Sequence, residues 1–499
     1  FVKQDDIDVW KHVYHEGRFV GVFQFTAQGA RNFCLAAQPT TITELAALTA
    51  IYRPGPLKAN VHRKYVKAKK NVSDIKYDHP VIEKVLGPTF NFVVFQEQFM
   101  TLAVELAGFS PGESDKLRKT LVKKSLDTMG NKGGEREVAR KKFVEGAYEL
   151  HGIDRSITEA LWKTIEAFSV YGFNKSHAVS YAIDSYYAAW LHTHYEHEWL
   201  ATILQSENNS PKGLEKAISE IKSYGYKFSA SDVNYSGIEW EYSSEARAFV
   251  PPLSSVKGVG NTAMDEIMMM RPYKNVFDLL YDEDGVWKHS KMNKTAFKSL
   301  CKVEAFGSLE DMQNGSIENH RQLLAILTED KNYETLRKGK FGMTKTQVKR
   351  AQKNGERLEP VLDALQDEYK ILPDWNRTEK ITNYMDLTSS VNNELVFPEK
   401  LVERITRKNI SSVFDVPAGE RGVGWFCITD VIAKTTKNGK PFYRFKCIDN
   451  NNNSGWVRVW GKFNDPPELY TIWVANVHND ANWGMSTSSY KIKRVTAYD

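Results

Sequence analysis

Apolar residues recur every three or four positions over several stretches of the chain, a spacing typical of amphipathic helices. Leu161, Ile165 and Phe168 form one face of such a helix, and Gly172 interrupts the pattern. A second helix follows, with a face made largely of small residues: Tyr181, Ala182, Ser185 and Ala189. The stretch 171–178, Tyr-Gly-Phe-Asn-Lys-Ser-His-Ala, therefore joins two predicted helices.

Other segments before residue 418 carry a similar helical pattern. Residues 310–417 are helical and charged and contain no motif that indicates a chemistry. Elsewhere, helices are predicted over 7–14, 42–50 and 214–224, and from Thr262 onward.

The last part of the chain changes from a helical pattern to short strands rich in aromatic and β-branched residues. Asn438-Gly439, between the first two strands, is typical of a two-residue hairpin turn. Five short strands in this rhythm predict an OB-fold barrel. The strands are predicted over 425–431, 442–448, 456–460, 470–477 and 490–496.

Composition and charge narrow the function classes. The 499 residues suffice for roughly three domains, and 41% are apolar. The net charge is only +5, but residues 51–150 hold 19 basic and 12 acidic residues, a balance of +7. The positive charge is therefore concentrated in one region, where it favours phosphate contacts or a solvated helix face.

Cysteine usage and hydropathy predict a cytoplasmic protein. The four cysteines lie far apart and form no Cys-x-x-Cys pair, which indicates reduced thiols. No apolar run approaches the length of a membrane span, and no signal peptide is evident. Because the sequence starts at Phe1, we expect a fragment, a processed product or one piece of a split protein.

The turn before the second helix has the composition of a phosphate site. Ser176 is a favourable N-cap residue, which places 174–177 at a helix N-terminus whose free N–H groups attract anions. Lys175 adds a charge, and Ser176 and His177 add hydrogen-bond donors. From spacing alone, a surface turn with a solvated lysine is equally compatible with these residues.

Further cations cluster upstream of this turn. Residues 115–124 contain a basic helix in which Lys116, Lys119 and Lys123 share one face, and an anion such as a triphosphate would relieve their repulsion. Residues 58–70 hold six basic residues and no acid. The Pro-Gly-Pro sequence after Arg53 predicts a rigid, extended turn that fixes this arginine.

No metal site is predicted in the chain. Asp5, Asp6 and Asp8 are better interpreted as a polar turn that caps the following helix than as metal ligands. The spacing of His192, His194 and His197 does not match a His-Glu-x-x-His motif.

Two segments carry features of nucleic-acid binding. Lys257, Gly258, Val259 and Gly260 precede a helix, as in a helix-hairpin-helix motif whose glycines let backbone N–H groups approach a phosphate. In the predicted barrel, aromatic residues would stack bases and basic residues would follow the backbone, although about half of these aromatics must face the barrel core. The stacking candidates are Tyr443, Phe445, Trp456 and Trp460, and the basic ones are Lys437, Lys440, Arg444 and Arg458.

The order of these motifs resembles that of the C-family bacterial replicative DNA polymerases, the DNA polymerase III alpha subunits. Tyr-Gly-Phe-Asn-Lys-Ser-His at 171–177 is similar to the signature of their fingers domain, and 21–25 to the segment that begins it. The Arg-Pro-Gly-Pro turn at Arg53, Gln96-Glu97-Gln98, the basic helix, the hairpin and the barrel follow in the family's order. The resemblance is closest between about residues 18 and 205 and weakest between 310 and 417.

The resemblance implies an α+β multidomain chain, with mostly helical regions followed by an OB-fold barrel. The domains expected are fingers at 1–210, a helix-hairpin-helix region that binds duplex DNA at 211–310, a helical linker at 311–417 and an OB domain at 418–499. The residues expected to bind the incoming nucleotide are Arg53, Gln96, Arg118, Lys119, Lys123, Lys124, Lys175, Ser176 and His177.

One part of the family pattern is missing. The family holds two Mg²⁺ ions on carboxylates of a palm domain, but no Pro-Asp-x-Asp-x-Asp motif occurs in this sequence. We therefore expect no catalytic residue here, an inactive isolated chain, and a palm supplied by another chain or a missing segment. The alternative is a non-catalytic DNA-binding replication factor derived from a polymerase.

The resemblance implies the function of a DNA-directed DNA polymerase, whose expected partners are primer–template DNA, a deoxynucleoside triphosphate and the palm-bearing chain. A sliding clamp is a further candidate, because 393–397 faintly resembles a clamp-binding peptide of the family. The alternative interpretation of that segment is an ordinary loop anchor.

Overall fold

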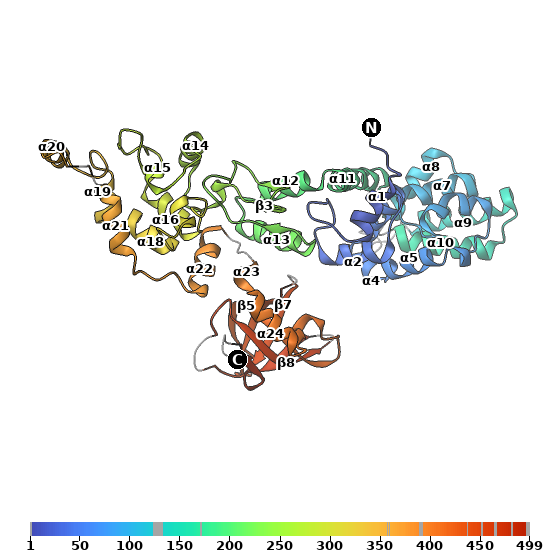
Figure 1. Cartoon of the computed structure of the whole chain (residues 1–499). Coiled ribbons are helices and arrows are strands. Elements are labelled where there is room, and N and C mark those ends of the chain that lie inside the picture. Colours follow the sequence, from blue (N-terminus) through green and yellow to red (C-terminus); the bar gives the residue numbers. More distant parts are fainter. Residues whose placement is uncertain are drawn as a thin grey trace. The chain divides into compact units, whose positions relative to one another are not determined.

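The computed structural model describes residues 2–122, 133–169, 172–356, 358, 360–388, 393–436, 438–450, 453–463, 467–480 and 483–495. The chain divides into two compact units, Phe1–Leu200 and Ala201–Asp499, and each is treated by itself (Figure 1). The calls on Lys123, Lys124 and Lys437 fall outside the described residues.

The first unit is helical throughout. Its elements in chain order are α1 (Ile7–Val9), η1 (Trp10–His15), α2 (Gln28–Ala37), α3 (Ile42–Ile51), α4 (Pro54–Lys58), α5 (Val61–Lys70), η2 (Val72–Asp74), α6 (Pro80–Leu86), η3 (Gly87–Thr89), α7 (Gln96–Ala107), α8 (Pro111–Val122), α9 (Gly133–His151), α10 (Arg155–Ser169), α11 (Lys175–His194) and the start of α12 (Glu196–Glu207).

The N-terminal carboxylates cap a helix, as predicted. The side chain of Asp6 accepts a hydrogen bond from the Asp8 N–H at 3.0 Å and so caps α1. The helix predicted over 7–14 begins as α1 and continues as η1, a π-helical segment. A π-helical turn is wider than an α-helical turn, so it changes the directions of the side chains in and after it, including His12.

Helix α11 runs through the core of the first unit. Its small residues Ala178, Ala182 and Ala189 are fully buried and pack with the alanine-rich α3. Ser185 lies on the same face and shares a hydrogen bond of 2.9 Å with the hydroxyl of Tyr14. The predicted small-residue face is thereby confirmed, because it lets two helices approach closely.

The turn predicted at Arg53-Pro54-Gly55-Pro56 is wrong. Pro54 instead begins the short helix α4, with Arg53 as its extended N-cap residue. A proline fits the first position of a helix because its missing N–H would have no intrahelical partner there. Arg53 keeps the extended conformation that a residue before proline prefers, and its side chain is still fixed in direction.

The second unit begins with helices around a small sheet. The helices are α13 (Pro211–Ser223), η5 (Leu253–Ser255), α14 (Asn261–Met270), α15 (Val276–Leu280), α16 (Lys294–Lys302), α17 (Glu310–Gln313), α18 (His320–Thr328), α19 (Asp330–Leu336), α20 (Lys345–Lys353), α21 (Val361–Tyr369), α22 (Arg377–Thr388), α23 (Asn393–Val396) and α24 (Glu399–Arg407). The sheet has the order β1–β3–β2, formed by β1 (Lys227–Phe228), β2 (Glu241–Ser243) and β3 (Ala248–Val250).

A buried carboxylate fixes the loop that leads into α16. Glu266 of α14 is 7% exposed and accepts hydrogen bonds from the backbone N–H groups of Ser290, Lys291 and Met292. Although burial opposes ionisation, these bonds lower the pKa of Glu266 to about 2. The charged carboxylate therefore joins α14 to the start of α16.

The chain ends in a five-stranded closed barrel. Its strands are β5 (Arg421–Thr435), β6 (Pro441–Ile448), β7 (Ser454–Trp460), β8 (Ile472–Asp480) and β9 (Gly484–Ser488), with β4 (Ser411–Ser412) and β10 (Ile492–Arg494) added at the margins. Strands β5, β6 and β7 form an antiparallel meander, β9 pairs in parallel with β7, and β8 closes the ring onto β5. This is the OB-fold connectivity, so the predicted fold class is confirmed.

The position predicted for the fifth barrel strand is wrong. The fifth barrel strand is β9, five residues from Gly484 to Ser488, whereas the segment predicted as that strand contributes only the marginal strand β10, Ile492–Arg494. Apart from Met485, β9 consists of glycine and small hydroxyl residues, so hydropathy does not reveal it. The hairpin around Asn438-Gly439 is present, with Gly439 at φ +76°.

Candidate nucleotide and nucleic-acid sites

The start of α11 has an asparagine cap rather than a serine cap. The Asn174 side chain accepts the His177 N–H at 2.9 Å and the Ser176 hydroxyl at 2.6 Å. The prediction of Ser176 as N-cap is therefore off by two residues, because Asn is an equally strong capping residue. Lys175, Ser176 and His177 occupy the exposed first turn, where donors can reach a ligand.

The backbone groups of this turn are less available to an anion than the sequence predicts. The Lys175 N–H donates to the Glu97 carboxylate at 2.8 Å, and Asn174 already uses the His177 N–H. Any phosphate here would have to compete with the Glu97 carboxylate. Its attraction must therefore come mainly from the side chains of Lys175, His177 and Arg53.

A short backbone bridge brings sequence-distant residues to this turn. Phe173 pairs with Phe95: the Gln96 N–H donates to the Phe173 carbonyl at 2.9 Å, and the Phe173 N–H donates to the Val94 carbonyl at 3.2 Å. The Gln96 side chain donates to the Gly172 carbonyl at 3.0 Å. Gln96 thus positions the turn through its backbone and its side chain.

Arg53 reaches the same place by stacking. Its Cζ atom lies 3.4 Å from the centroid of the Phe173 ring. Partial burial lowers the pKa of Arg53, although a guanidinium remains charged at neutral pH. The centroid of the His177 ring lies 5.3 Å from that of Phe173 and 4.1 Å from that of Tyr181, with the rings tilted to each other in both pairs.

These contacts define the turn cluster: Arg53, Gln96, Phe173, Lys175, Ser176 and His177. Five of the residues that the sequence assigned to nucleotide binding come from three helices, α4, α7 and α11, and meet here. Sequence reasoning missed Phe173 and Glu97 as parts of the site. The signals were present, since Phe173 stands inside the motif at 171–177 and Glu97 inside Gln96-Glu97-Gln98. Gln98 is buried and caps α7, which makes it structural.

In the described part of the chain, the basic helix α8 packs against α7, α9 and α10. Leu117 and Leu121 are buried, as predicted for its inner side. Arg118 and Lys119 both pair with Asp115, at 2.8 and 2.7 Å. These two cations therefore already have an anionic partner one turn away, so their repulsion is partly relieved without a triphosphate. Lys123 and Lys124 are outside the described residues.

Helices α16 and α22 contact the hairpin at 256–260. Gly258 has φ +94°, and a Cβ there would lie 2.6 Å from the Ser299 hydroxyl of α16. Lys257 donates through its N–H and its Nζ to carbonyls of α22. Val259 is buried, whereas Gly260 precedes α14 with open space around it. Only Gly258 is required by the backbone and its packing.

The outer face of β6 and β7 combines aromatic and basic side chains. The Arg444 Cζ lies 4.5 Å from the centroid of the Trp456 ring, and the Arg458 Cζ lies 5.7 Å from that of Trp460. Phe442, which sequence reasoning missed, packs on Trp460 with ring centroids 5.1 Å apart. We call these five residues the barrel face.

The remaining barrel residues lie elsewhere. Phe445 is fully buried, which excludes it from base stacking, and Tyr443 shares its side of the strand and packs on Phe463 at 5.3 Å. Lys440 lies at the end of the β5–β6 hairpin. Side chains alternate between the two faces of a strand, so the inward-facing and outward-facing aromatic residues could have been separated from the sequence if the inner face had been known.

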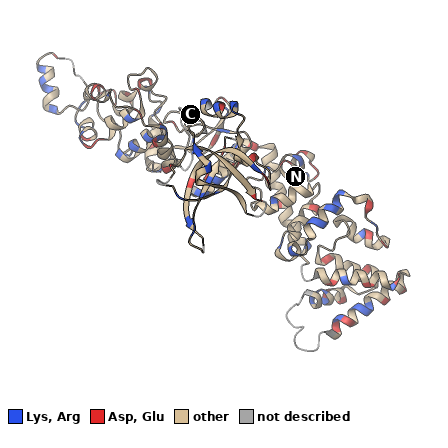
Figure 2. Ribbon diagram, turned by 90° about the horizontal axis from the view of Figure 1, so that it is seen from below, with Lys and Arg blue, Asp and Glu red and all other residues tan. Residues whose placement is uncertain are grey.

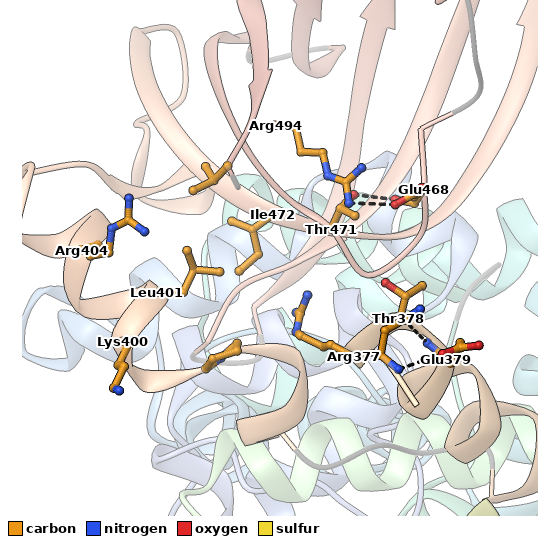
Figure 3. A pocket seen from close by; sticks show the side chains of 13 residues that line it. Arg377, Thr378, Glu379, Lys400, Leu401, Arg404, Glu468, Thr471, Ile472 and Arg494 are labelled. Atoms are coloured by element: carbon orange, nitrogen blue, oxygen red, sulfur yellow. Dashed lines mark hydrogen bonds and ion pairs between the residues drawn. The ribbon is translucent and has the colours of Figure 1, made fainter. Parts of the chain in front are cut away.

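A cavity of about 800 Å³ lies between α22, α24 and the barrel (Figure 3). Arg377 points into this seam and donates to the carbonyls of Leu395, Val396 and Tyr470, and Arg494 pairs with Glu468 at 2.8 Å. The hydrogen bonds of Arg377 connect α22 to α23 and to the barrel at Tyr470. The ion pair of Arg494 and Glu468 lies within the barrel region. Val396 and Phe397 are buried beside it, which favours the loop-anchor interpretation of 393–397 over a clamp peptide.

All charged residues of one helix are basic. Helix α20 carries Lys345, Lys349, Arg350 and Lys353 without an acidic residue, and none of its side chains is buried. Helices α8 and α9, by contrast, carry both basic and acidic residues, and Figure 2 shows both kinds of charge over much of the ribbon. Among the described residues, no helix is both long and apolar enough to cross a membrane.

A helix-hairpin-helix region, an OB barrel and a cationic turn cluster are together typical of the class of nucleic-acid-binding proteins. Comparison with known proteins makes this specific. Residues 2–149 match the model of the bacterial DNA polymerase III alpha subunit finger domain, and residues 225–315 match a helix-hairpin-helix motif. By these matches the chain is similar to the DNA polymerase III alpha subunits over its fingers and helix-hairpin-helix segments.

Relatives in several bacteria support this assignment. The DNA polymerase III subunit alpha of Aquifex aeolicus is 29% identical over 469 residues, covering 93% of this chain and 36% of the relative. That of Borreliella burgdorferi is 33% identical over 64% of this chain and 27% of its own length. That of Chlamydia muridarum is 34% identical over 59% of this chain and 23% of its own length. The chain thus spans about a third or less of these relatives.

Proposed function

We propose that this chain is the fingers and DNA-binding portion of a replicative DNA-directed DNA polymerase. It would bind the incoming deoxynucleoside triphosphate and the primer–template during template-directed nucleotidyl transfer. The observation that carries the proposal is the turn cluster, in which Arg53, Lys175 and His177 converge around Phe173 within the family's signature motif.

The turn cluster would act by electrostatic stabilisation. Phosphoryl transfer needs positive charge and hydrogen-bond donors placed around the triphosphate and the departing pyrophosphate, with no covalent step by the protein. Arg53 offers a fixed planar guanidinium, and Lys175 offers a mobile ammonium. Glu97 would keep the turn in place, and its charge would limit how tightly the triphosphate is held.

The second unit would hold the nucleic acid. Duplex DNA would meet the hairpin at 256–260, and the basic helix α20 would add contacts to phosphates. The barrel face would bind single-stranded template, because arginines beside exposed aromatic rings suit stacked bases and a charged backbone. In an OB-fold the second and third strands commonly form such a face, and these are β6 and β7 here.

The residues of this chain do not fit the Mg²⁺ ions of the polymerase reaction. Magnesium takes oxygen ligands, mainly carboxylates and water. Within the described residues, the one group of three clustered metal-type ligands contains two histidines and a single carboxylate. We therefore propose that the Mg²⁺ ions are held mainly by a palm outside these 499 residues, on another chain or on a further segment.

Nucleotide titration with a charge-removing variant tests the proposal. In the polymerase assembled with its palm, Lys175→Ala should raise the apparent nucleotide dissociation constant about tenfold, as expected for one lost charge-assisted contact. Binding of primer–template should stay nearly unchanged. Lys163→Ala, at an exposed lysine of α10, removes the same charge from the same unit and is the matched control.

Lys175→Ala and Lys163→Ala together distinguish a specific nucleotide contact from a general effect of charge. If Lys175→Ala leaves the apparent nucleotide affinity unchanged, the assignment of the turn cluster to nucleotide binding is wrong. Equal losses in both variants would indicate a general effect of charge rather than a contact. A loss of nucleotide and DNA binding together would indicate a damaged fold, which thermal unfolding would reveal.

A further inference from the structure

Three potential metal ligands converge at the end of α11 opposite to the turn cluster. His12 comes from η1, His192 from the last turn of α11, and Glu196 from the first residue of α12. One ligand atom of each lies within 4.8 Å of the others. The chain bends at Tyr195, between α11 and α12, which returns the Glu196 side chain toward His192.

The separations fit a small tetrahedral ion. The Glu196 Oε1 atom is 3.5 Å from His12 Nε2 and 3.7 Å from His192 Nε2. Ligands at roughly 2.0–2.2 Å from a tetrahedral zinc ion stand about 3.3–3.5 Å from one another. A contraction of a few tenths of an ångström would therefore bring the carboxylate oxygen to coordinating distance with either histidine, and the two histidines, whose ligand atoms lie within 4.8 Å of each other, would approach each other to complete the set.

The cluster is largely shielded from solvent. The His192 side chain is fully buried, and those of His12 and Glu196 are 23% and 20% exposed. The Nε2 atom of His12 is buried and makes no hydrogen bond to any described residue. A buried polar atom without a hydrogen bond is uncommon in folded proteins, and a bound ion is one explanation for it.

We propose that His12, His192 and Glu196 bind a zinc-type divalent metal ion through the two Nε2 atoms and one carboxylate oxygen. Two histidines and one glutamate are a ligand set that zinc accepts, with water in the fourth position. Imidazole nitrogen favours zinc and neighbouring transition metals over Mg²⁺. The proposal does not depend on the polymerase function.

Among the described residues, Arg18 competes with an ion for the Glu196 carboxylate. Its Nη1 atom lies 2.7 Å from Glu196 Oε1. Arg18 and the two histidines face the same oxygen, Oε1, so a rotation of the Glu196 carboxylate would give one oxygen to the ion and the other to the guanidinium. Arg18 then acts as a positioning residue rather than as a replacement for the metal.

The ion would tie the amino-terminal segment to the α11–α12 junction. Helix α11 is 20 residues long and carries the turn cluster at its first turn and His192 at its last. The π-helical turn of η1 places His12 toward that junction. Bound metal would therefore restrain the end of α11 that lies about 30 Å from Lys175.

Metal binding by the purified protein tests the proposal directly. The full chain would be stripped with a chelator and titrated with Zn²⁺ by calorimetry, and with Co²⁺ as a spectroscopic probe. We expect about one ion per chain, a rise in the thermal unfolding midpoint and visible absorption typical of four-coordinate Co²⁺. His12→Gln and Glu196→Gln should each weaken Zn²⁺ binding about 100-fold.

Two further variants make the result unambiguous. His197→Gln removes a histidine next to Glu196 that lies outside the cluster, and Zn²⁺ binding should persist. Arg18→Gln should also retain Zn²⁺, because the arginine only positions Glu196. His192→Gln is buried and could fail to fold, but the His12 and Glu196 variants decide without it.

The proposal fails if the wild-type chain binds no Zn²⁺ at micromolar concentration, in which case Arg18 is the only cation of the cluster. It also fails if His197→Gln weakens binding as much as His12→Gln. The first result would leave Glu196 paired with Arg18 beside two histidines, and the second would place the bound ion elsewhere.

Discussion

The guanidinium of Arg53 lies over the ring of Phe173, with Cζ 3.4 Å from the ring centroid. These residues are 120 positions apart, and their contact links the start of α4 to the signature turn before α11. A guanidinium held on an aromatic face is fixed in direction while its edges stay available to donate. The stack therefore supports a positioned phosphate contact rather than a solvated charge.

Arg53→Lys should weaken nucleotide binding although the charge is kept. A lysine loses the planar stack and the forked donors, and a cation–π contact is worth about 0.5–2 kcal/mol, so the affinity should fall roughly 2- to 30-fold. Apparent nucleotide affinity in the assembled polymerase is the measurement. Arg63→Lys, on the exposed side of α5, is the matched control, and equal affinity in all three proteins would contradict a role for the stack.

Gly258 and Gly260 should respond differently to the same substitution. Gly258→Ala forces a Cβ into the left-handed region and against Ser299, so we expect about 1–2 kcal/mol lower stability and weaker duplex binding. Gly260→Ala meets open space and should be tolerated. Thermal unfolding and duplex titration at several salt concentrations check this. Equal behaviour of the two variants would mean that the hairpin packs differently from the arrangement described.

The salt dependence carries the functional part of the hairpin prediction. If backbone–phosphate contacts are made at 256–260, bulky residues at both glycines should lower the duplex affinity and the slope of its salt dependence. Single-strand binding by the barrel should survive in the same variant. A double variant that binds duplex DNA like wild type would leave the hairpin with a structural role only.

Trp456→Ala and Trp460→Ala should each weaken single-stranded DNA binding. Stacking of a base on an aromatic side chain contributes about 1–3 kcal/mol, and both rings are more than a third exposed beside arginines. Fluorescence titration with a short oligonucleotide is the measurement. Tyr490→Ala removes an exposed aromatic residue that lies outside β6 and β7, and it should bind normally. A larger loss at Tyr490 would place the binding surface elsewhere.

The sequence predicts local features of this protein better than long-range ones. The small-residue face of α11, the Asp6 cap and three strands of the barrel follow from periodicity and capping preferences. The Pro-Gly-Pro helix was missed because proline is compatible with both a turn and a first helical turn. The strand β9 was missed because its small polar residues lack an apolar signature.

Contacts between distant segments account for the rest of the site. That Phe173 bridges Phe95 and stacks with Arg53 depends on how α4, α7 and α11 pack, which no local pattern encodes. The same holds for His12 and Glu196, which are 184 positions apart and were not considered together. The sequence did indicate Arg53, Gln96, Lys175, Ser176 and His177, through a family motif rather than through geometry.

The chain of these 499 residues should bind primer–template DNA and add no nucleotide at any Mg²⁺ concentration. In-line displacement at the α-phosphate needs metal ions that bridge the primer hydroxyl and the triphosphate, and anchored carboxylates place such ions. The turn cluster supplies cations and donors, and the neighbouring carboxylate of Glu97 already accepts the Lys175 N–H. Extension should appear when a palm-bearing polypeptide is added and vanish when the palm aspartates are changed to asparagine.

Primer extension assays with and without that palm decide between two functions. Extension that needs both polypeptides supports the polymerase, whereas DNA binding without extension in any combination supports a non-catalytic DNA-binding factor. Asp6→Asn is the informative control, because Asp6 caps α1 and accepts from His194 at 2.8 Å. Extension by the isolated chain that is lost in Asp6→Asn would mean that the amino-terminal carboxylates hold the metal ions after all.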